Sequence, residues 1–256
     1  MTLLAAEHIA VNRGGRAILR DVSVQAHAGE FIAVLGPNGA GKSTLLTVLA
    51  GLLKPGAGQV MLDAKRLSQL TALQLAQRRA YLPQNPRLEW PLTVERLVAL
   101  GLTPRLPATG GLPESYGPAI SRALELCDLS DKRDQVATTL SGGEFARAML
   151  ARAIVSEPQI LIVDEPITGL DPRHAMQCMQ LLKDFARNGT LVIAAVHDLT
   201  LAYRYATRAI VVVDGAVMFD ADSLTEEIIH SAFGVRALAV GAGDSRGFTL
   251  LSPSEK

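Results

Sequence analysis

A glycine-rich stretch near the N-terminus has the residue types needed to hold phosphate groups. It reads GPNGAGKST over residues 36–44 and fits the pattern G-x-x-x-x-G-K-[ST] through Ser43. In such a loop the backbone N–H groups turn toward phosphate oxygens, and the positive end of the following helix adds to the attraction. Lys42 can reach the β- and γ-phosphates, and Ser43 can give its hydroxyl to Mg²⁺. The stretch predicts a nucleotide site that contains Gly36, Pro37, Asn38, Gly39, Ala40, Gly41, Lys42, Ser43 and Thr44.

Two adjacent carboxylates later in the chain could complete this site. The run ILIVD at 160–164 predicts a buried strand with Asp164 at its C-terminal end, where ligands of open α/β sheets bind. Mg²⁺ prefers oxygen ligands of this kind, together with phosphates and water. Glu165 can instead point at an attacking water. The alternative is that the two carboxylates only begin a solvated turn.

A second glycine-rich stretch raises a separate question. LSGGE at 140–144 lies just before EFARAMLARAIV, whose apolar stripe of Phe145, Met149 and Ile154 predicts a helix. Free N–H groups at a helix N-terminus, with a serine hydroxyl, can bind an anion. Ser141 could equally be an ordinary helix N-cap after a flexible turn. The residues alone leave both interpretations open.

The elements that position these loops follow from apolar runs and turn residues. FIAVL at 31–35, ILIVD, LVIAAV at 191–196 and AIVVV at 209–213 suit strands buried on both faces of a mostly parallel sheet covered by helices. The first thirty residues predict a small antiparallel β region with a turn at Gly14 and Gly15. VVVDGAVMF at 211–219 predicts a hairpin. The fold class is therefore α/β.

The middle of the chain loses this strand rhythm. Residues 86–139 contain the helical stretches VERLVALG and PAISRALELCDL, separated by a loop at 102–118 that is rich in Pro and Gly. We interpret residues of approximately 86–155 as a helical subdomain inserted into the α/β core of one domain that spans residues 1–256.

Composition excludes several classes of protein. Lysine plus arginine equals aspartate plus glutamate at 25 each, so no global positive field exists to hold nucleic acid. Cys127 and Cys178 have no metal-like spacing. The longest apolar runs fall well short of the roughly 18 to 20 residues that a membrane span needs. The N-terminus also lacks the pattern of a secretion signal, so we expect a chain that does not cross a bilayer by itself.

The order of six motifs resembles the ATP-binding subunit of an ABC transporter. These motifs are GPNGAGKST, YLPQ at 81–84, LSGGE, ILIVDEP at 160–166, TGLD at 168–171 and AVHD at 195–198. The resemblance implies a P-loop NTPase core that hydrolyses ATP with Mg²⁺. It also implies that two copies pair head to tail, with each ATP between the phosphate loop of one copy and the signature loop of the other. The signature residues are Leu140, Ser141, Gly142, Gly143 and Glu144.

The same resemblance assigns roles to individual residues. Glu165 is similar to the general base, which acts with Lys42, and His197 to the histidine that contacts the γ-phosphate. Gln84 corresponds to the glutamine that senses Mg²⁺ and water, so the implied metal set is Ser43, Gln84 and Asp164. Asp171 resembles the aspartate that crosses the dimer interface.

Arg13 marks a departure from the family pattern. Many members carry an aromatic residue near positions 12 and 13 to stack on adenine, whereas this chain has Asn12 and Arg13. A guanidinium can also stack on a base, so we include Arg13 in the predicted ATP site.

Two further stretches narrow the resemblance. Residues 81–105 and the run EEIIHSAFGVRAL at 226–238 are similar to ATPase subunits of bacterial importers for iron-siderophore complexes, haem and cobalamin. We expect an importer of chelated metal, with haem or ferric siderophore ahead of cobalamin. The expected partners are a second copy of the chain, a transmembrane permease and, indirectly, a substrate-binding protein, but no nucleic acid. The expected location is peripheral, on the cytoplasmic face of the inner membrane.

Two other functions remain as alternatives. An importer of free metal ions or molybdate is the nearest. A soluble ABC ATPase in DNA repair or translation belongs to another class, and such proteins usually have two cassettes in one chain, a long coiled coil or a basic linker, none of which the sequence suggests.

Several other side chains are expected to have structural or surface roles rather than catalytic ones. Trp90 could line a permease groove or pack in the core. Arg147 and Arg152 could meet acidic partners, but we expect them to lie on a solvated helix face. Four histidines are read as structural or surface groups, namely His8, His27, His174 and His230.

Overall fold

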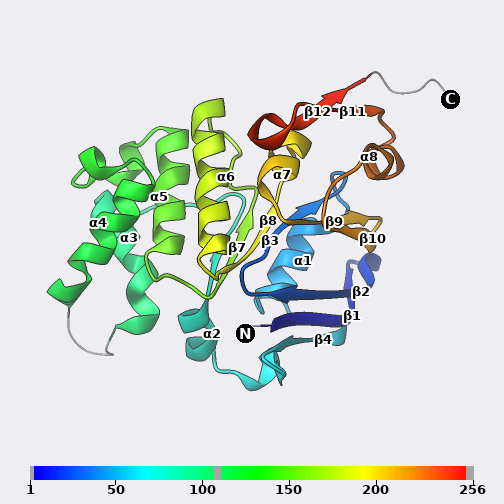
Figure 1. Ribbon diagram of the computed structural model, residues 1–256. Helices are drawn as coiled ribbons and strands as arrows, with labels where there is room; N and C mark the ends of the chain where they lie inside the picture. The colour runs from blue at the N-terminus through cyan, green and yellow to red at the C-terminus, as the bar shows by residue number, and fades with distance from the viewer. Residues whose placement is uncertain (1–2, 107–110, 252–256) are drawn as a thin grey trace.

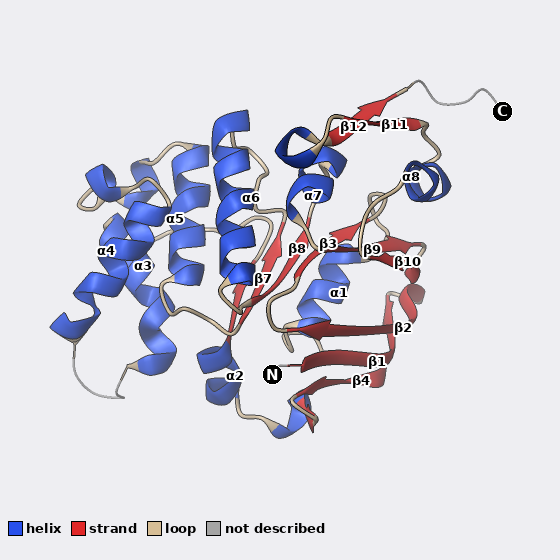
Figure 2. Ribbon diagram, viewed as in Figure 1, coloured by secondary structure: helices blue, strands red, loops and turns tan. Residues whose placement is uncertain are grey.

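A six-stranded sheet forms the centre of the computed structural model, which describes residues 3–106 and 111–251. The strand order is β10-β9-β3-β8-β7-β6, with β10 antiparallel to β9 and all other pairs parallel (Figures 1 and 2). Every residue of β3, β7 and β8 is buried, as their continuous apolar runs predict. The strands are β3 (Phe31–Leu35), β6 (Arg79–Leu82), β7 (Ile160–Asp164), β8 (Leu191–Ala195), β9 (Arg208–Val213) and β10 (Ala216–Ala221).

An antiparallel sheet near the N-terminus covers one face. Its order is β2-β1-β4-β5, with strands β1 (Leu3–Arg13), β2 (Arg16–His27), β4 (Ala57–Leu62) and β5 (Lys65–Arg66). The predicted turn at Gly14 and Gly15 joins β1 to β2, and both glycines have positive φ. The predicted hairpin at 211–219 is also present, as β9 and β10.

The central strands divide the interior into two cores, because successive side chains of a strand point to opposite faces. Ile32 and Val34 of β3 pack with helix α1 (Lys42–Leu49) and the antiparallel sheet. Ala33 and Leu35 pack on the other face. Helices α6 (Pro172–Arg187), α7 (Leu199–Tyr205) and α8 (Glu226–Phe233) contribute to that second core. The α/β fold with a mostly parallel sheet is therefore confirmed.

Helical segments connect β6 to β7. They are α3 (Val94–Ala99), α4 (Gly117–Leu126) and α5 (Gly142–Ile154), with 3₁₀ turns at Leu100–Arg105, Glu114–Tyr116, Ser130–Lys132 and Ala137–Thr139. The expected loop at 102–118 thus contains two short helical turns, while residues 107–110 lie outside the described residues. We propose that these elements form the inserted subdomain predicted at approximately 86–155. Helix α2 (Ala72–Arg78) and the 3₁₀ turn Leu67–Gln69 precede β6.

A small hairpin near the C-terminus packs on α7. It consists of β11 (Ala237–Val240) and β12 (Gly247–Leu250), with a 3₁₀ turn at Gly243–Ser245. The Phe248 ring centroid lies 4.6 Å from that of Tyr203, and the Phe248 N–H donates to Thr200 Oγ1 at 3.1 Å. The sequence analysis did not predict this hairpin. None of the helices in the described parts of the chain is long and apolar enough to span a membrane.

Candidate nucleotide site

The phosphate loop is held between two strands, and its glycines are required by that geometry. Gly36 has φ +143°, and a Cβ atom there would lie 2.0 Å from the Val212 carbonyl oxygen in β9. Gly41 has φ +105°, and a Cβ atom there would lie 2.8 Å from the Ile18 carbonyl oxygen in β2. Only glycine fits such conformations and such close backbone approach. The chain itself therefore builds the loop.

Lys42 is the first residue of α1 and lies inside this loop. Its side chain is buried, and Nζ donates to the carbonyl oxygens of Gly36 at 2.8 Å and Pro37 at 3.0 Å. Burial lowers the pKa of the ammonium, and the carboxylates of Glu165 and Asp164 oppose that shift. The structure thus brings Lys42 and both predicted carboxylates to one place.

Asp164 lies at the end of β7, and only 3% of it is exposed. Its Oδ1 atom is buried and has no hydrogen-bond partner. Burial raises the pKa of this carboxyl group, while a hydrogen bond from Ser43 acts against the increase. A buried carboxylate oxygen without a partner is costly, so it points to a cation that binds there. Ser43 and Asp164 therefore offer the oxygen ligands that Mg²⁺ requires.

Glu165 directly follows β7, and three side chains hold its carboxylate. It adopts a left-handed conformation with φ +54°, and its N–H donates to Ala195 O at 3.1 Å. Oε1 contacts His197 Nε2, and Oε2 accepts from Thr168 Oγ1 at 3.1 Å. Burial raises the pKa of the carboxyl group, but hydrogen bonds from His197, Gln84 and Thr168 outweigh it and leave the pKa lowered. Glu165 is therefore an oriented carboxylate at neutral pH.

Thr168 is a site residue that the sequence analysis did not assign. It belongs to the quoted TGLD motif, three residues after Glu165. The turn between them closes through a Thr168 N–H bond to Glu165 O at 3.2 Å. The sequence therefore shows the motif, but it does not predict the contact between Thr168 and Glu165, which depends on the left-handed turn at Glu165.

The signature loop begins helix α5. Ser141 is its N-cap, as the simpler of the two interpretations predicts: Oγ accepts from the Glu144 N–H at 3.3 Å, and Glu144 Oε2 accepts from the Ser141 N–H at 2.9 Å. No atom lies within 4 Å of a Cβ built on Gly142, and the nearest to one on Gly143 is Leu170 Cδ2 at 3.7 Å. Within the part of the chain that the structure describes, no neighbour requires these two glycines, and Leu140 before them is half-buried.

Two further predicted site residues, Asp171 and Arg13, make no hydrogen bond or ion pair with the phosphate loop in the described parts of the chain. Asp171 caps α6. Arg13 ends β1 on the hairpin that brings Ile18 against Gly41, and its guanidinium makes no hydrogen bond or ion pair with the described residues. In the same parts of the chain, no hydrogen bond or ion pair joins residues 140–144 to residues 36–44. The predicted site residues thus form two separate groups in one chain.

The exposure of three other side chains, Trp90, Arg147 and Arg152, tests what the sequence predicted for them. Trp90 is 72% exposed, so packing in the core is excluded. Arg147 and Arg152 are half-buried, and Arg147 Nε donates to Cys127 O at 3.1 Å. The expectation of a solvated face is wrong for both arginines: α5 packs against the turn after α4 at Arg147, and burial lowers the pKa of Arg152.

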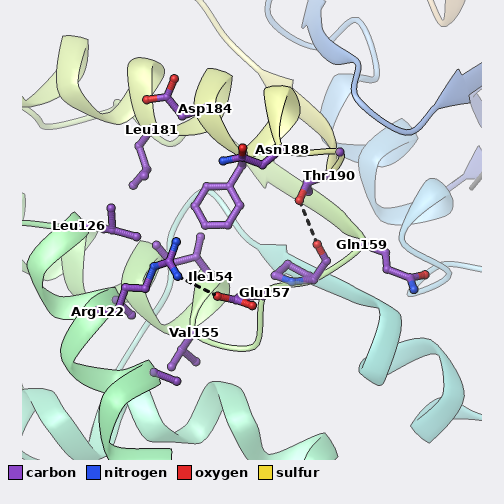
Figure 3. Close-up of a pocket in the computed structure, with 15 residues that line it drawn as sticks. Arg122, Leu126, Ile154, Val155, Glu157, Gln159, Leu181, Asp184, Asn188 and Thr190 are labelled. Atoms are coloured by element: carbon purple, nitrogen blue, oxygen red, sulfur yellow. Dashed lines mark hydrogen bonds and ion pairs between the residues drawn. The ribbon is translucent and has the colours of Figure 1, made fainter.

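A cleft of about 600 Å³ lies elsewhere, beside α4 and the C-terminal ends of α5 and α6 (Figure 3). Leu126, Ile154 and Leu181 provide apolar lining, and Arg122 pairs with Glu157 at 3.7 Å beside them. None of the predicted phosphate-binding or catalytic residues lines this cleft. It is not part of the candidate nucleotide site.

Comparison with known protein families gives a single result. A family profile described as ABC transporter matches residues 19–168. The hemin import ATP-binding protein HmuV of Rhodococcus jostii is 41% identical over 236 residues, which cover 90% of this chain and 80% of that protein. HmuV of Pseudomonas aeruginosa is 37% identical and covers 97% of this chain and 99% of its own length.

Solved structures with a similar fold include ATP-binding subunits and cassettes of ABC transporters. The dimeric structure of a bacterial ABC transporter cassette superimposes with a TM-score of 0.78 at 27% identity, covering 87% of this chain and 99% of that one. The ATP-binding subunit of another ABC transporter gives 0.77, also at 27% identity, covering 91% of this chain and 93% of that one.

Proposed function

The chain belongs to the ABC transporter family and is an ATPase of that family, and from this premise we propose that it powers a bacterial importer of haem. The observation that carries the proposal is the gathering of Lys42, Ser43, Asp164 and Glu165 at one edge of the central sheet. Those groups can hold a nucleotide's phosphates and direct a water molecule at them. The haem assignment is supported by the names of the relatives in Rhodococcus jostii and Pseudomonas aeruginosa.

The phosphate loop binds and orients the substrate in this mechanism. Its backbone N–H groups and the N-terminus of α1 face the phosphate oxygens, and Lys42 exchanges its carbonyl partners for the β- and γ-phosphates. Ser43, Asp164 and Gln84 would hold Mg²⁺, which when bound supplies positive charge to the phosphate oxygens. The proposed ATP-binding set is Gly36, Pro37, Asn38, Gly39, Ala40, Gly41, Lys42, Ser43, Thr44 and Arg13.

Glu165 acts as the base. It is ionised, and Thr168 and His197 fix both of its oxygens, so it can accept a proton from the attacking water at Oε. The water oxygen attacks the γ-phosphorus, the bond to the β-phosphate oxygen breaks, and ADP and phosphate leave. His197 Nε2 contacts this carboxylate, and we propose, as the family resemblance implies, that His197 contacts the γ-phosphate when ATP is bound.

A second copy of the chain completes the site. Gly142 and Gly143 leave the N-terminus of α5 open, and no described residue packs into the space beside Gly142. Phosphate groups bind at such helix termini. We infer that the loop of Leu140, Ser141, Gly142, Gly143 and Glu144 binds the nucleotide of the partner copy, with Asp171 at the same interface.

The proposed assembly also contains a transmembrane permease and, outside the membrane, a substrate-binding protein. Trp90 is a large exposed apolar side chain six residues after Gln84, which suits a docking surface next to the nucleotide site. The ATPase would then lie at the cytoplasmic face of the inner membrane. Nucleic acid is not a proposed partner.

Growth on haem as the iron source tests the cargo directly. Cells without the gene should lose growth on haem but keep growth on ferric salt, and wild-type protein should restore it while Glu165→Gln should not. The tagged chain should capture a permease from detergent-solubilised membranes. Unchanged growth on haem, with lost uptake of free metal ions or molybdate, would favour the nearest alternative. Capture of ribosomes or DNA-bound proteins without a permease would overturn the transport function.

A further inference from the structure

The Asp171 carboxylate is engaged on both oxygens by a single residue. Oδ1 accepts from the His174 backbone N–H at 3.0 Å, and His174 Nδ1 lies 2.5 Å from Oδ2. Both hydrogen bonds lower the pKa of Asp171, and the bond from the imidazole has the larger effect. An N-cap needs only one side-chain oxygen. The second contact therefore fixes how the carboxylate is turned at the start of α6.

The other ring nitrogen of His174 faces a different part of the chain. Nε2 lies 3.9 Å from Oδ2 of Asp128, in the turn after α4. At this distance the contact is electrostatic rather than a direct hydrogen bond. Asp128 is fixed in a left-handed conformation with φ +53°, and its N–H donates to Glu125 O at 3.0 Å. The imidazole thus lies between a core helix and the inserted helices.

A hydrogen bond connects the turn that contains Asp128 to the signature helix α5. The adjacent Cys127 carbonyl accepts from Arg147 Nε of α5 at 3.1 Å. A cleft of about 380 Å³ separates these elements and is lined by Asp128, Arg147 and His174, among others. Cys127 and Cys178 also line this cleft and belong to one buried apolar core, so the polar contacts of His174 and Arg147 add to that packing. At the start of the helices, Gly143 lies near Leu170, so both loops belong to one surface.

We propose that His174 is a positioning residue that couples the Asp171 loop to the inserted helices and so sets the surface that the second copy's nucleotide meets. The path runs from Asp171 through His174, Asp128 and Arg147 to the helix that Ser141 begins. This proposal rests on the proposed function, because the surface matters for hydrolysis only if a second copy binds there.

Two variants break the path without touching a nucleotide-binding residue. Asp128→Asn removes the charge and keeps a residue type that tolerates the left-handed conformation. His174→Asn keeps an N–H donor on the carbon atom that bears Nδ1, and it loses the reach toward Asp128. Asp131→Asn is the matched control, because Asp131 is 75% exposed on the same turn and pairs with Lys132 rather than with His174.

Steady-state ATP hydrolysis by the full chain supplies the first readout. We expect kcat to fall about two- to fivefold in Asp128→Asn and in His174→Asn, the range that exposed ion pairs give. The KM for ATP should stay unchanged, because the phosphate loop is intact. The double variant should be no worse than either single variant, because both break one path. Asp131→Asn should match the wild type.

Hydrogen–deuterium exchange without nucleotide supplies the second readout. Exchange at residues 126–130 and 169–175 should increase in both variants and not in the control. The proposal is overturned if Asp128→Asn behaves as Asp131→Asn does, if the two effects on kcat multiply, or if exchange is unchanged. A wild-type chain that hydrolyses no ATP would contradict the proposed function instead, and the exchange data would still decide whether the bridge exists.

Discussion

The two glycine-rich loops of this chain differ in what requires their glycines. In the phosphate loop, a Cβ on Gly36 would lie 2.0 Å from the Val212 carbonyl oxygen, so the surrounding strands demand glycine. In the signature loop, a Cβ on Gly142 would meet no atom within 4 Å. The first loop is complete within one chain. Among the described residues none lies against Gly142, and this difference supports the proposed site shared between two copies.

The largest effect separates the two loops by stability. Gly36→Ala should destabilise the fold by about 4 kcal/mol or more, because the new Cβ cannot avoid the β9 backbone and the conformation is left-handed. Gly142→Ala should change the free energy of unfolding by less than about 0.5 kcal/mol. Urea unfolding followed by circular dichroism measures both values. Equal losses of stability would remove the distinction between the loops.

The next effect separates the loops by function. Gly142→Asp places a carboxylate at the N-terminus of α5, which favours the helix but repels phosphate. Hydrolysis should fall by about 100-fold, a typical cost for disturbing groups that stabilise transition-state charge. Binding of a fluorescent ATP analogue to the phosphate loop should remain. Gly142→Asn is the uncharged control, and a loss of activity as large as that of the aspartate variant would argue against charge as the cause.

Asp164 tests how much stability the fold loses by burying a carboxylate beside the phosphate loop. Its pKa is raised by burial, so in the pH range just above the carboxyl group's ordinary value of 3.8 the folded state binds more protons than the unfolded state. Stability is therefore lost as pH rises through that range. Asp164→Asn removes this cost, and the thermal midpoint at pH 7 should rise by about 2–4 °C while hydrolysis is lost. A midpoint difference that shrinks as pH rises from 4 to 7 would contradict this explanation.

Trp90 gives the smallest effect and lies outside both loops. Because it is 72% exposed, Trp90→Ala should change the free energy of unfolding by less than about 0.5 kcal/mol and leave ATP hydrolysis by the isolated chain unchanged. Its effect should appear only as weaker capture of the permease. A large loss of stability would show that the side chain packs after all.

The sequence predicted those elements whose signal is local. Strands β3, β7 and β8 are continuous apolar runs, and the glycine-rich loops can be read directly from residue spacing. Strand β6 (Arg79–Leu82) was not predicted, because it is short and half-buried at the sheet edge. The hairpin of β11 and β12 has no alternating apolar pattern and owes its place to contacts with α7.

Contacts between distant residues explain the rest. The roles of Lys42 and Asp164 follow from motifs, and the structure places them together. His174 could be read only as a surface or structural histidine, because Asp128 comes close to it through the packing of α4 against α6. Arg147 was misread for the same reason, since its partner is a backbone carbonyl that no residue type reveals.

Sedimentation of Glu165→Gln with ATP and Mg²⁺ tests the shared site most directly. This variant should bind ATP without hydrolysing it, and its mass should double from the 27.2 kDa of one chain. The double variant Glu165→Gln, Gly142→Asp should bind ATP equally well and remain at the mass of one chain, because the signature loop can no longer hold the partner's phosphates. Dimerisation of the double variant to the same extent, or a Glu165→Gln chain that stays monomeric while saturated with ATP, would contradict the account.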